Sequence, residues 1–299
     1  MSAQSFDVVV IGAGPVGEVA AERARRGGLS VALVEHERFG GECSYWACIP
    51  SKALLRPGTL LAAARRIPGI PVGDRLDPSA VFARRDAFTG KGDDTGQVDW
   101  AKGVGIEALR GHARITGERE VTLDGDRVLR ANRAVIVCTG SVPSVPPIPG
   151  IDGISVWGSR EATSASAVPA RLGVLGGGVV GVEMAQAWAT LGADVHLIIT
   201  GERPLPKLPG FVGDAVLEGL RAAGVTVHTG SGLSGVSSVD GGTELELKGG
   251  ETITVDELLV ATGRRPATKD LGLESIGLEA GKTLTADANG RVSGVDGDW

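Results

Sequence analysis

Aromatic residues, strong charge and long apolar runs are all scarce in this chain of 299 residues. With 5 Phe, 5 Trp and 1 Tyr, a folded core has to be built mainly from Val, Leu, Ile and Ala. The net charge of −6 gives no basic surface for a polyanion, so nucleic acid is not expected as a partner. No apolar run approaches the ~20 residues of a membrane helix, and no signal peptide is recognisable, so no membrane association is expected.

Cysteine and histidine are too few for a disulfide-stapled or metal-stabilised fold. Three cysteines do not make a disulfide framework in a chain of this size, which favours a reducing, cytoplasmic compartment. In that compartment Cys43 and Cys48, five residues apart, suggest catalysis or metal binding. Zinc needs more ligands than two sulfurs, and the 4 histidines are scattered without ligand spacing, so no metal site is predicted. Two inert buried thiols remain an alternative.

Glycine, by contrast, is abundant, and part of it falls in an internal repeat. It accounts for 47 of the 299 residues, against roughly 7% in average usage. Residues 7–35 align without a gap on residues 171–199, at a constant offset of 164. Each copy has the apolar run of a buried strand, a glycine turn, a helical pattern and a second apolar run. The sequence therefore predicts an α/β protein with two Rossmann-like dinucleotide-binding domains.

The glycines of each turn have separate physical roles. The first permits a sharp turn, the second lets the backbone approach a pyrophosphate, and the third brings the helix close to the strand. The amino end of that helix then attracts the phosphates. Turns with nothing bound are the alternative. The predicted phosphate-binding positions are Gly12, Gly14 and Gly17 in the first copy and Gly176, Gly178 and Gly181 in the second.

The end of each second apolar run indicates which ribose is bound. Glu35 stands 23 residues after Gly12, where a carboxylate accepts hydrogen bonds from an adenosine ribose. The equivalent position in the second copy is Ile199, so no acid selects an unphosphorylated ribose there. Arg203 follows, and its planar guanidinium suits a 2′-phosphate, with a solvated loop arginine as the alternative. The pattern favours NADPH over NADH at the second site.

The cysteine segment carries a resemblance to a known family. The stretch GGECSYWACIPSK (40–52) resembles the redox-active disulfide motif of the class I pyridine nucleotide–disulfide oxidoreductases. Similar motifs follow at RGHARIT (110–116), VIVCTGSVPSVP (135–146) and LLVATGRRP (258–266). The resemblance implies FAD at the first turn, NADPH or NADH at the second, and electron transfer to a Cys43–Cys48 disulfide. The implied activity is reduction, or reoxidation, of a small-molecule or protein substrate of the thiol/disulfide type.

The family's residue roles carry over by position. By resemblance, Cys48 is the sulfur beside the flavin and Cys43 is the thiol that meets the substrate. Lys52 is expected near the flavin N5, paired with Glu183. Two alternatives stay open: a diaphorase or quinone reductase with an idle disulfide, and a non-enzymatic nucleotide-binding module. Further positions that match cofactor-binding motifs are Gly41, Ala113, Thr139, Gly140 and Gly263.

The chain departs from the family pattern in two places. Tyr45 and Trp46 stand between the cysteines instead of small residues, so two aromatic rings are expected to narrow substrate access or line a pocket. The chain also ends where the family would continue, so we expect it to lack the C-terminal α+β dimerisation domain through which the family forms homodimers.

Three segments are expected from the motifs. The first is an FAD-binding domain with the redox disulfide (1–146), the second an NAD(P)-binding domain (147–267), and the third the start of the returning FAD segment (268–299). Within the first domain, residues 68–99 are expected to be irregular because Pro, Gly and Asp are frequent there.

Overall fold

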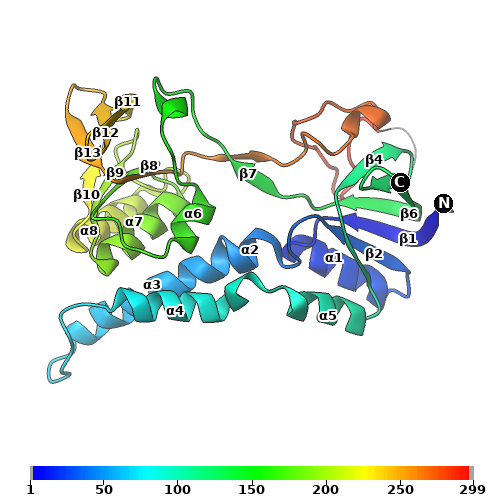
Figure 1. Ribbon diagram of the computed structural model, residues 1–299, viewed down its shortest axis with the longest axis horizontal. Coiled ribbons are helices and arrows are strands. Elements are labelled where there is room, and N and C mark those ends of the chain that lie inside the picture. The colour runs from blue at the N-terminus through cyan, green and yellow to red at the C-terminus, as the bar shows by residue number, and fades with distance from the viewer. Residues whose placement is uncertain (1–2, 296–299) are drawn as a thin grey trace. The chain divides into compact units, whose positions relative to one another are not determined.

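The computed structural model describes residues 3–295, and their contacts form two compact units (Figure 1). Unit 1 comprises Met1–Ser44, Gly92–Val142 and Arg264–Trp299, and unit 2 comprises Tyr45–Lys91 and Pro143–Gly263. Two of the passages between the units lie close to the expected boundaries after 146 and 267. Residues 45–91, however, pack with unit 2, although the motifs had placed them in the first domain.

Unit 1 is built on a six-stranded sheet in the order β3-β2-β1-β6-β5-β4. The strand β1 pairs in parallel with both β2 and β6, and it buries both of its faces. Val8 and Val10 pack into a core with Phe39, whereas Val9 and Ile11 join a second core on the other face. The elements are β1 (Gln4–Ile11), α1 (Pro15–Arg26), β2 (Val31–Glu35), α5 (Thr95–Gly103), β3 (Glu107–Arg110), β4 (Ala113–Gly117), β5 (Glu120–Leu123) and β6 (Arg127–Val137).

Unit 2 contains a parallel sheet in the order β10-β9-β8-β14, which matches β3-β2-β1-β6 of unit 1 strand for strand. The predicted pair of Rossmann-like units is therefore confirmed. A separate three-stranded antiparallel sheet, β11-β12-β13, packs on one face. The elements are β8 (Arg171–Leu175), α7 (Val179–Leu191), β9 (Asp194–Ile198), α8 (Gly210–Ala222), β10 (Thr226–His228), β11 (Leu233–Val239), β12 (Gly242–Leu247), β13 (Thr252–Val255) and β14 (Glu257–Val260).

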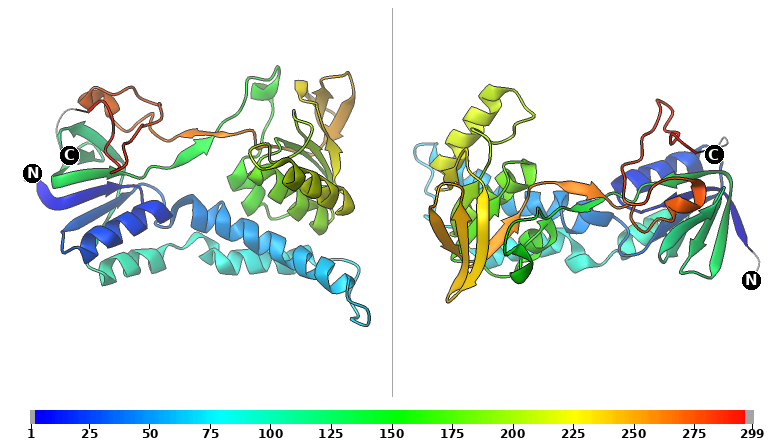
Figure 2. Two further views of the ribbon diagram at one scale, coloured as in Figure 1. Left: turned by 180° about the vertical axis from the view of Figure 1, so that it is seen from behind. Right: turned by 90° about the horizontal axis from the view of Figure 1, so that it is seen from above.

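The long helix α3 (Cys48–Arg65) packs in unit 2 against α4 (Pro78–Phe88), α6 (Ser159–Ser164) and α7 (Figure 2). A Cβ on Gly58 would lie 2.8 Å from the Thr190 hydroxyl of α7, so only glycine permits this close helix contact. No helix of the described residues has the length and apolar character needed to cross a membrane. The short elements are α2 (Gly41–Tyr45), β7 (Ser141–Pro143), β15 (Arg264–Pro266), η1 (Gly90–Gly92), η2 (Ile151–Gly153) and η3 (Leu273–Ile276).

The expectation of an irregular segment at 68–99 is wrong for most of its length. Helix α4 occupies its middle, and α5 begins before its end. Asp77 caps α4 by accepting a hydrogen bond from the Ser79 N–H at 2.9 Å, and Pro78 occupies the first turn. Asp and Pro in this order are signals for a helix start, because the capping oxygen satisfies an unpaired N–H and proline needs none.

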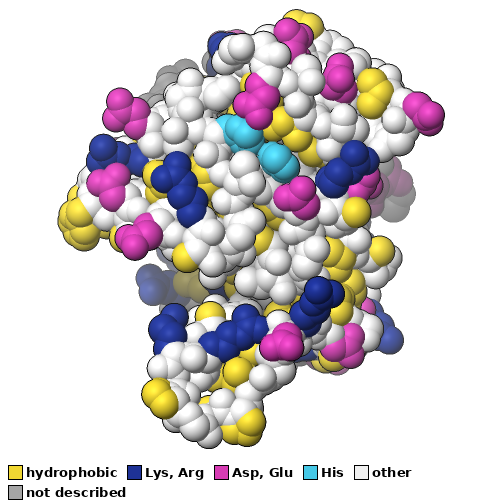
Figure 3. Space-filling model, turned by 90° about the vertical axis from the view of Figure 1, so that its left-hand side faces the viewer, with side chains coloured by type: hydrophobic (Ala, Val, Ile, Leu, Met, Phe, Trp, Pro, Cys, Tyr) yellow, Lys and Arg dark blue, Asp and Glu magenta, His cyan; other side chains and the backbone are white. Residues whose placement is uncertain are grey.

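Two histidines that are 32 residues apart in sequence lie together in unit 2. His196 on β9 and His228 on β10 stack with ring centroids 5.3 Å apart, and His196 Nδ1 lies 3.0 Å from His228 Nε2. Figure 3 shows two histidine side chains together at the surface, with acidic side chains nearby. Asp194 lies 3.7 Å from His196, and Glu251 lies 3.7 Å from His228. The outer ring nitrogens therefore face carboxylates.

The close approach of α7 to the end of β8 requires glycine at position 181, which can be tested through stability. A Cβ on Gly181 would lie 1.9 Å from the Gly176 carbonyl oxygen, so Gly181→Ala should displace the helix. We expect a loss of about 1–3 kcal/mol in the free energy of unfolding, measured by urea denaturation. Gly178→Ala is the matched control, because no described atom lies within 4 Å of its Cβ position. It should cost less than about 1 kcal/mol; equal losses would contradict the steric account.

The histidine pair predicts a pH dependence of stability. Burial lowers the pKa of His228, Glu251 opposes this effect, and His196 adds to it. The unfolded chain then binds more protons than the folded one just below the unfolded histidine pKa of about 6.5. The free energy of unfolding should therefore fall as the pH is lowered from about 7.5 to about 5.5. His228→Gln should flatten this slope in urea titrations, and an unchanged slope would contradict the assignment.

Candidate active site

The first glycine turn lies at the carboxyl end of β1 and leads into α1. Gly12 has φ 100°, and a Cβ there would lie 2.3 Å from the Cys138 carbonyl oxygen. A Cβ on Gly17 would lie 1.8 Å from the Gly12 carbonyl oxygen. At Gly14, by contrast, no described atom lies within 4 Å of the Cβ position. The turn is closed on the protein side and open beside the amino end of α1, as a phosphate-binding turn requires.

Gly41 completes this surface. With φ 56°, it places its Cβ position 2.7 Å from the Cα of Gly14, so the two backbones are in direct contact. A side chain at either position would fill or distort the cradle between them. The residues therefore fit an extended phosphate group that approaches the main chain closely.

Glu35, at the end of β2, lies beside the same turn. Its Oε2 accepts a hydrogen bond from the Ala13 N–H at 2.9 Å, and its Oε1 accepts one from the Glu37 N–H at 2.8 Å. Burial by itself would raise the pKa of Glu35, but hydrogen bonds from His36, Glu37 and Ala13 outweigh it and lower the pKa. The result is a buried, ionised carboxylate, which suits a ribose hydroxyl donor.

The other residues matched to FAD binding lie on or after β4 and β6 of unit 1. Ala113 is buried at the start of β4. Thr139 and Gly140 follow β6, and the Cys138 N–H donates to the Ile11 carbonyl at 2.8 Å, which holds this segment beside the glycine turn. Gly140 has φ 70°. Burial raises the pKa of the Cys138 thiol, so this cysteine acts as a small apolar residue.

The second glycine turn repeats the geometry of the first. A Cβ on Gly176 would lie 2.5 Å from the Ala261 carbonyl oxygen, and one on Gly181 would lie 1.9 Å from the Gly176 carbonyl oxygen. Around Gly178 the Cβ position again has no described atom within 4 Å. Gly263 lies two residues beyond Ala261, after β14, and its carbonyl accepts the Ser144 N–H at 3.0 Å. Both copies therefore offer the same open backbone surface.

Arg203 lies in the loop after β9 and contacts helix α8. Its Nη1 is 3.4 Å from Asp214 Oδ2, and its Nη2 is 4.0 Å from the Glu202 carboxylate. Ile199 at the end of the strand is buried, and it supplies no acid for a ribose. A phosphate at this loop would therefore compete with Asp214 for the guanidinium.

Lys52 and Glu183 are brought together on the facing helices α3 and α7. The Lys52 Nζ lies 2.7 Å from the Glu183 carboxylate oxygens, and the Ser51 hydroxyl donates to Glu183 Oε2 at 3.1 Å. Because the Lys52 side chain is 62% exposed, the pair contributes little to stability and serves mainly to fix geometry. It lies one helical turn beyond Cys48.

The two cysteines of the motif flank the passage between the units. Cys43 belongs to α2 in unit 1, and Cys48 begins α3 in unit 2. The Cys48 side chain is exposed, that of Cys43 is half-buried, and both carry thiols. The Ala47 carbonyl accepts the Ser51 N–H at 2.9 Å, so Cys48 occupies the first position of the helix. A thiol at this position reaches solvent and is open to exchange.

The aromatic residues between the cysteines pack against each other. Tyr45 is only 5% exposed and Trp46 is half-buried, and their expected effect on substrate access stays a prediction. The Tyr45 ring packs against Trp46 at 5.7 Å. The Arg160 guanidinium lies 4.0 Å from the centre of the Trp46 ring, and the Thr163 hydroxyl donates to the Trp46 carbonyl at 3.1 Å. No pattern in the sequence indicates these two contacts from α6.

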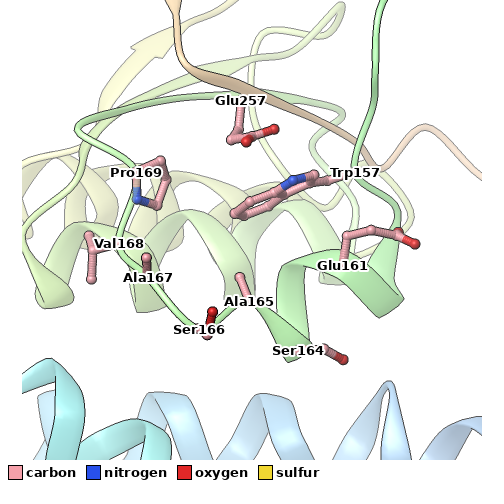
Figure 4. Close-up of a pocket in the computed structure, with 9 residues that line it drawn as sticks. All are labelled: Trp157, Glu161, Ser164, Ala165, Ser166, Ala167, Val168, Pro169 and Glu257. Atoms are coloured by element: carbon pink, nitrogen blue, oxygen red, sulfur yellow. The ribbon is translucent and has the colours of Figure 1, made fainter.

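A surface depression of about 430 Å³ lies next to α6 in unit 2. Figure 4 shows Trp157 and Glu257 beside it, with residues 164–169 running along its edge. Burial raises the pKa of Glu257, and Asp256 adds to this shift. The lining residues include none of the side chains that the sequence selected, so this depression is separate from the candidate site.

Known proteins of similar sequence cover nearly all of this chain. It is 35% identical to dihydrolipoyl dehydrogenase 3 of Pseudomonas aeruginosa, over 99% of this chain and 66% of that protein. It is 36% identical to dihydrolipoyl dehydrogenase of Chlorobaculum tepidum (93% and 61%) and 30% identical to mercuric reductase of Staphylococcus aureus (93% and 51%). The chain thus spans less than two thirds of the length of these relatives.

A solved structure shows the same fold. The HOCl-induced flavoprotein disulfide reductase RclA from Escherichia coli matches with a TM-score of 0.83 at 24% identity, over 96% of this chain and 64% of that one. Residues 6–297 match the family described as pyridine nucleotide-disulphide oxidoreductase. With the paired glycine turns, the matched strand orders and these relatives, the chain belongs to the pyridine nucleotide-disulphide oxidoreductase family.

Proposed function

We propose that this chain carries the FAD site, the NAD(P)H site and the redox-active cysteines of an enzyme that exchanges electrons with a thiol/disulfide-type substrate. Members of its family use FAD and NAD(P)H. A bound FAD would supply the capacity for hydride and two-electron transfer, which the side chains of this protein lack. The observation that carries the proposal is the pair of geometrically equivalent glycine turns, together with the Lys52–Glu183 pair one turn from Cys48.

The residues of unit 1 fit FAD. Gly12 and Gly17 close the turn, while Gly14 and Gly41 leave room for a pyrophosphate against the main chain. The ionised carboxylate of Glu35 would accept the adenosine ribose hydroxyls. Ala113, Thr139 and Gly140 are proposed as further FAD contacts, because their motifs match those of the family.

The residues of unit 2 fit a nicotinamide dinucleotide. Gly176, Gly178 and Gly181 repeat the phosphate-binding surface, and Gly263 is proposed to face the nicotinamide ribose. Ile199 cannot accept hydrogen bonds from a ribose, so the position that holds the ribose carboxylate in the first copy carries no acid in the second. Arg203 would pair with a 2′-phosphate after release from Asp214, and we therefore favour NADPH over NADH.

Lys52 and Glu183 are proposed to act beside the redox centre. The ammonium group of Lys52 would stabilise negative charge that develops on a reduced neighbour, and Glu183 keeps this ammonium in one place through two hydrogen bonds of 2.7 Å. Ser51 fixes the Glu183 carboxylate in turn. The three side chains form one hydrogen-bonded unit on α3 and α7.

Cys43 and Cys48 are proposed to carry out thiol–disulfide exchange. A Cys43 thiolate attacks one sulfur of a substrate disulfide, and the first substrate thiol leaves. Cys48 then attacks the Cys43 sulfur, which releases the second thiol and leaves the Cys43–Cys48 disulfide. The substrate gains the two electrons that the protein dithiol loses, and the reverse sequence oxidises a dithiol. A small-molecule or protein substrate and a cytoplasmic location remain predictions.

Substitution of each cysteine tests the proposed exchange. In the FAD-loaded chain, Cys43→Ser and Cys48→Ser should each lower NADPH-dependent disulfide reduction by at least about a hundredfold, because no other thiol completes the exchange. Oxidation of NADPH by an artificial acceptor should persist in both variants. Anaerobic reduction should produce a long-wavelength thiolate-to-flavin absorbance band that only Cys48→Ser abolishes. Disulfide reduction that survives both substitutions would contradict the proposed exchange. Acceptor-dependent NADPH oxidation without disulfide reduction in the unsubstituted chain would identify a diaphorase with an idle cysteine pair.

The cofactor preference is tested at Arg203. Arg203→Ala should weaken NADPH binding by about tenfold or more, because a charged hydrogen bond to the 2′-phosphate is lost, and should leave NADH binding unchanged. Asp214→Asn is the matched variant, since it removes the competing carboxylate and should tighten NADPH binding. Calorimetric titration of both nucleotides measures these effects. An equal effect of Arg203→Ala on NADPH and NADH would remove Arg203 from cofactor choice.

A further inference from the structure

We propose that Thr163 and Arg160 of α6 are positioning residues that hold the segment between Cys43 and Cys48 in the conformation from which the disulfide closes. They act through Trp46. This inference rests on the proposed function of the two cysteines as a redox pair. It adds that residues outside the cysteine motif, on α6, support this function.

The contacts to Trp46 come from both its main chain and its side chain. The Thr163 hydroxyl donates to the Trp46 carbonyl at 3.1 Å, and Thr163 is only 2% exposed, so the donor has a fixed position. The same hydroxyl also lies 2.8 Å from the Ser159 carbonyl of its own helix, so its single proton is shared between the two carbonyls. The Arg160 guanidinium covers the Trp46 ring at 4.0 Å, a cation–π arrangement. Tyr45 packs against the same ring and is itself buried.

A second set of contacts holds the chain on the other side of Cys48. Ser51 and Lys52 both bond Glu183 of α7. Cys48 therefore lies between two anchored points, Trp46 on α6 and residues 51–52 on α7, all within unit 2. Because the chain is held on both sides, less conformational freedom is lost when its sulfur forms a bond.

The start of α3 depends on such outside contacts. Ala47 precedes the helix with φ −138° and ψ −98°, and its side chain makes no capping hydrogen bond. A capping Ser, Thr, Asp or Asn would hold this residue by itself. In this chain, the contacts of Thr163 and Arg160 with Trp46 take the place of such a cap. We infer that the large residues between the cysteines are anchors of this segment, a role that agrees with the burial of Tyr45 and with the arginine over Trp46.

The test is the equilibrium between dithiol and disulfide in the whole chain, measured in glutathione redox buffers. Oxidised glutathione takes two electrons from Cys43 and Cys48 and leaves as two reduced molecules, while the protein gains one disulfide. Alkylation followed by mass analysis gives the disulfide fraction. Trp46→Leu, Arg160→Ala and Thr163→Val should each lower the equilibrium constant for disulfide formation by about 3–10-fold, since the freed segment must be ordered again on closure.

Conservative and matched variants separate positioning from folding. Arg160→Lys and Thr163→Ser retain the cation and the hydroxyl, so they should return the equilibrium constant toward that of the original chain. Thr59→Val is the matched control, because among the described residues the Thr59 hydroxyl bonds the Leu55 carbonyl of its own helix and nothing on α6, and it should leave the constant unchanged. The positioning role would be overturned if the equilibrium constant for disulfide formation were the same in Trp46→Leu, Arg160→Ala and Thr163→Val as in Thr59→Val. If the unsubstituted chain forms no Cys43–Cys48 disulfide in any buffer, the proposed function fails instead.

Discussion

The close contact between helix and strand at each glycine turn is the constraint on which the candidate site depends. Gly17 touches the Gly12 carbonyl in unit 1, and Gly181 touches the Gly176 carbonyl in unit 2, at distances that any side chain would prevent. The contact brings the amino end of each helix beside an open stretch of main chain. Glu35 and the loop with Arg203 follow the next strand in each copy, so the same contact determines where a ribose would lie. The same steric requirement, met in both copies, thus places the two proposed nucleotide sites.

The cysteine motif joins these two halves through the chain itself. Cys43 belongs with the first glycine turn, whereas Cys48 begins a helix that packs on the second unit through Gly58 and the Lys52–Glu183 pair. The hydrogen bonds of Ser51 and Lys52 to Glu183, and the contacts of α6 with Trp46, hold the Cys48 end of the motif. The proposed chemistry therefore relies on helices of unit 2 as much as on the motif that contains the sulfurs.

The sequence predicted those features that depend on local spacing. The glycine repeat predicted two equivalent α/β units, and their strand orders agree. Local composition misled at 68–99, where Asp77 and Pro78 start a helix instead of breaking the chain. Of the contacts between distant segments, the Lys52–Glu183 pair was indicated by the family resemblance, whereas two others had no signal in the sequence. His196 meets His228 only because their strands are neighbours, and Trp46 meets Arg160 only because α6 packs beside the start of α3.

The central claim is that a bound flavin and the Cys43–Cys48 disulfide act together. The number of electrons that the chain takes up tests this claim most directly. The FAD-loaded chain, first oxidised, is titrated anaerobically with a reductant of known strength, and the flavin absorbance is followed together with the number of alkylatable thiols. A flavin and a Cys43–Cys48 disulfide that act together require four electrons per FAD, and two new thiols appear before reduction is complete. Complete reduction with two electrons and no new thiols would show that the cysteines take no part, and it would contradict the account.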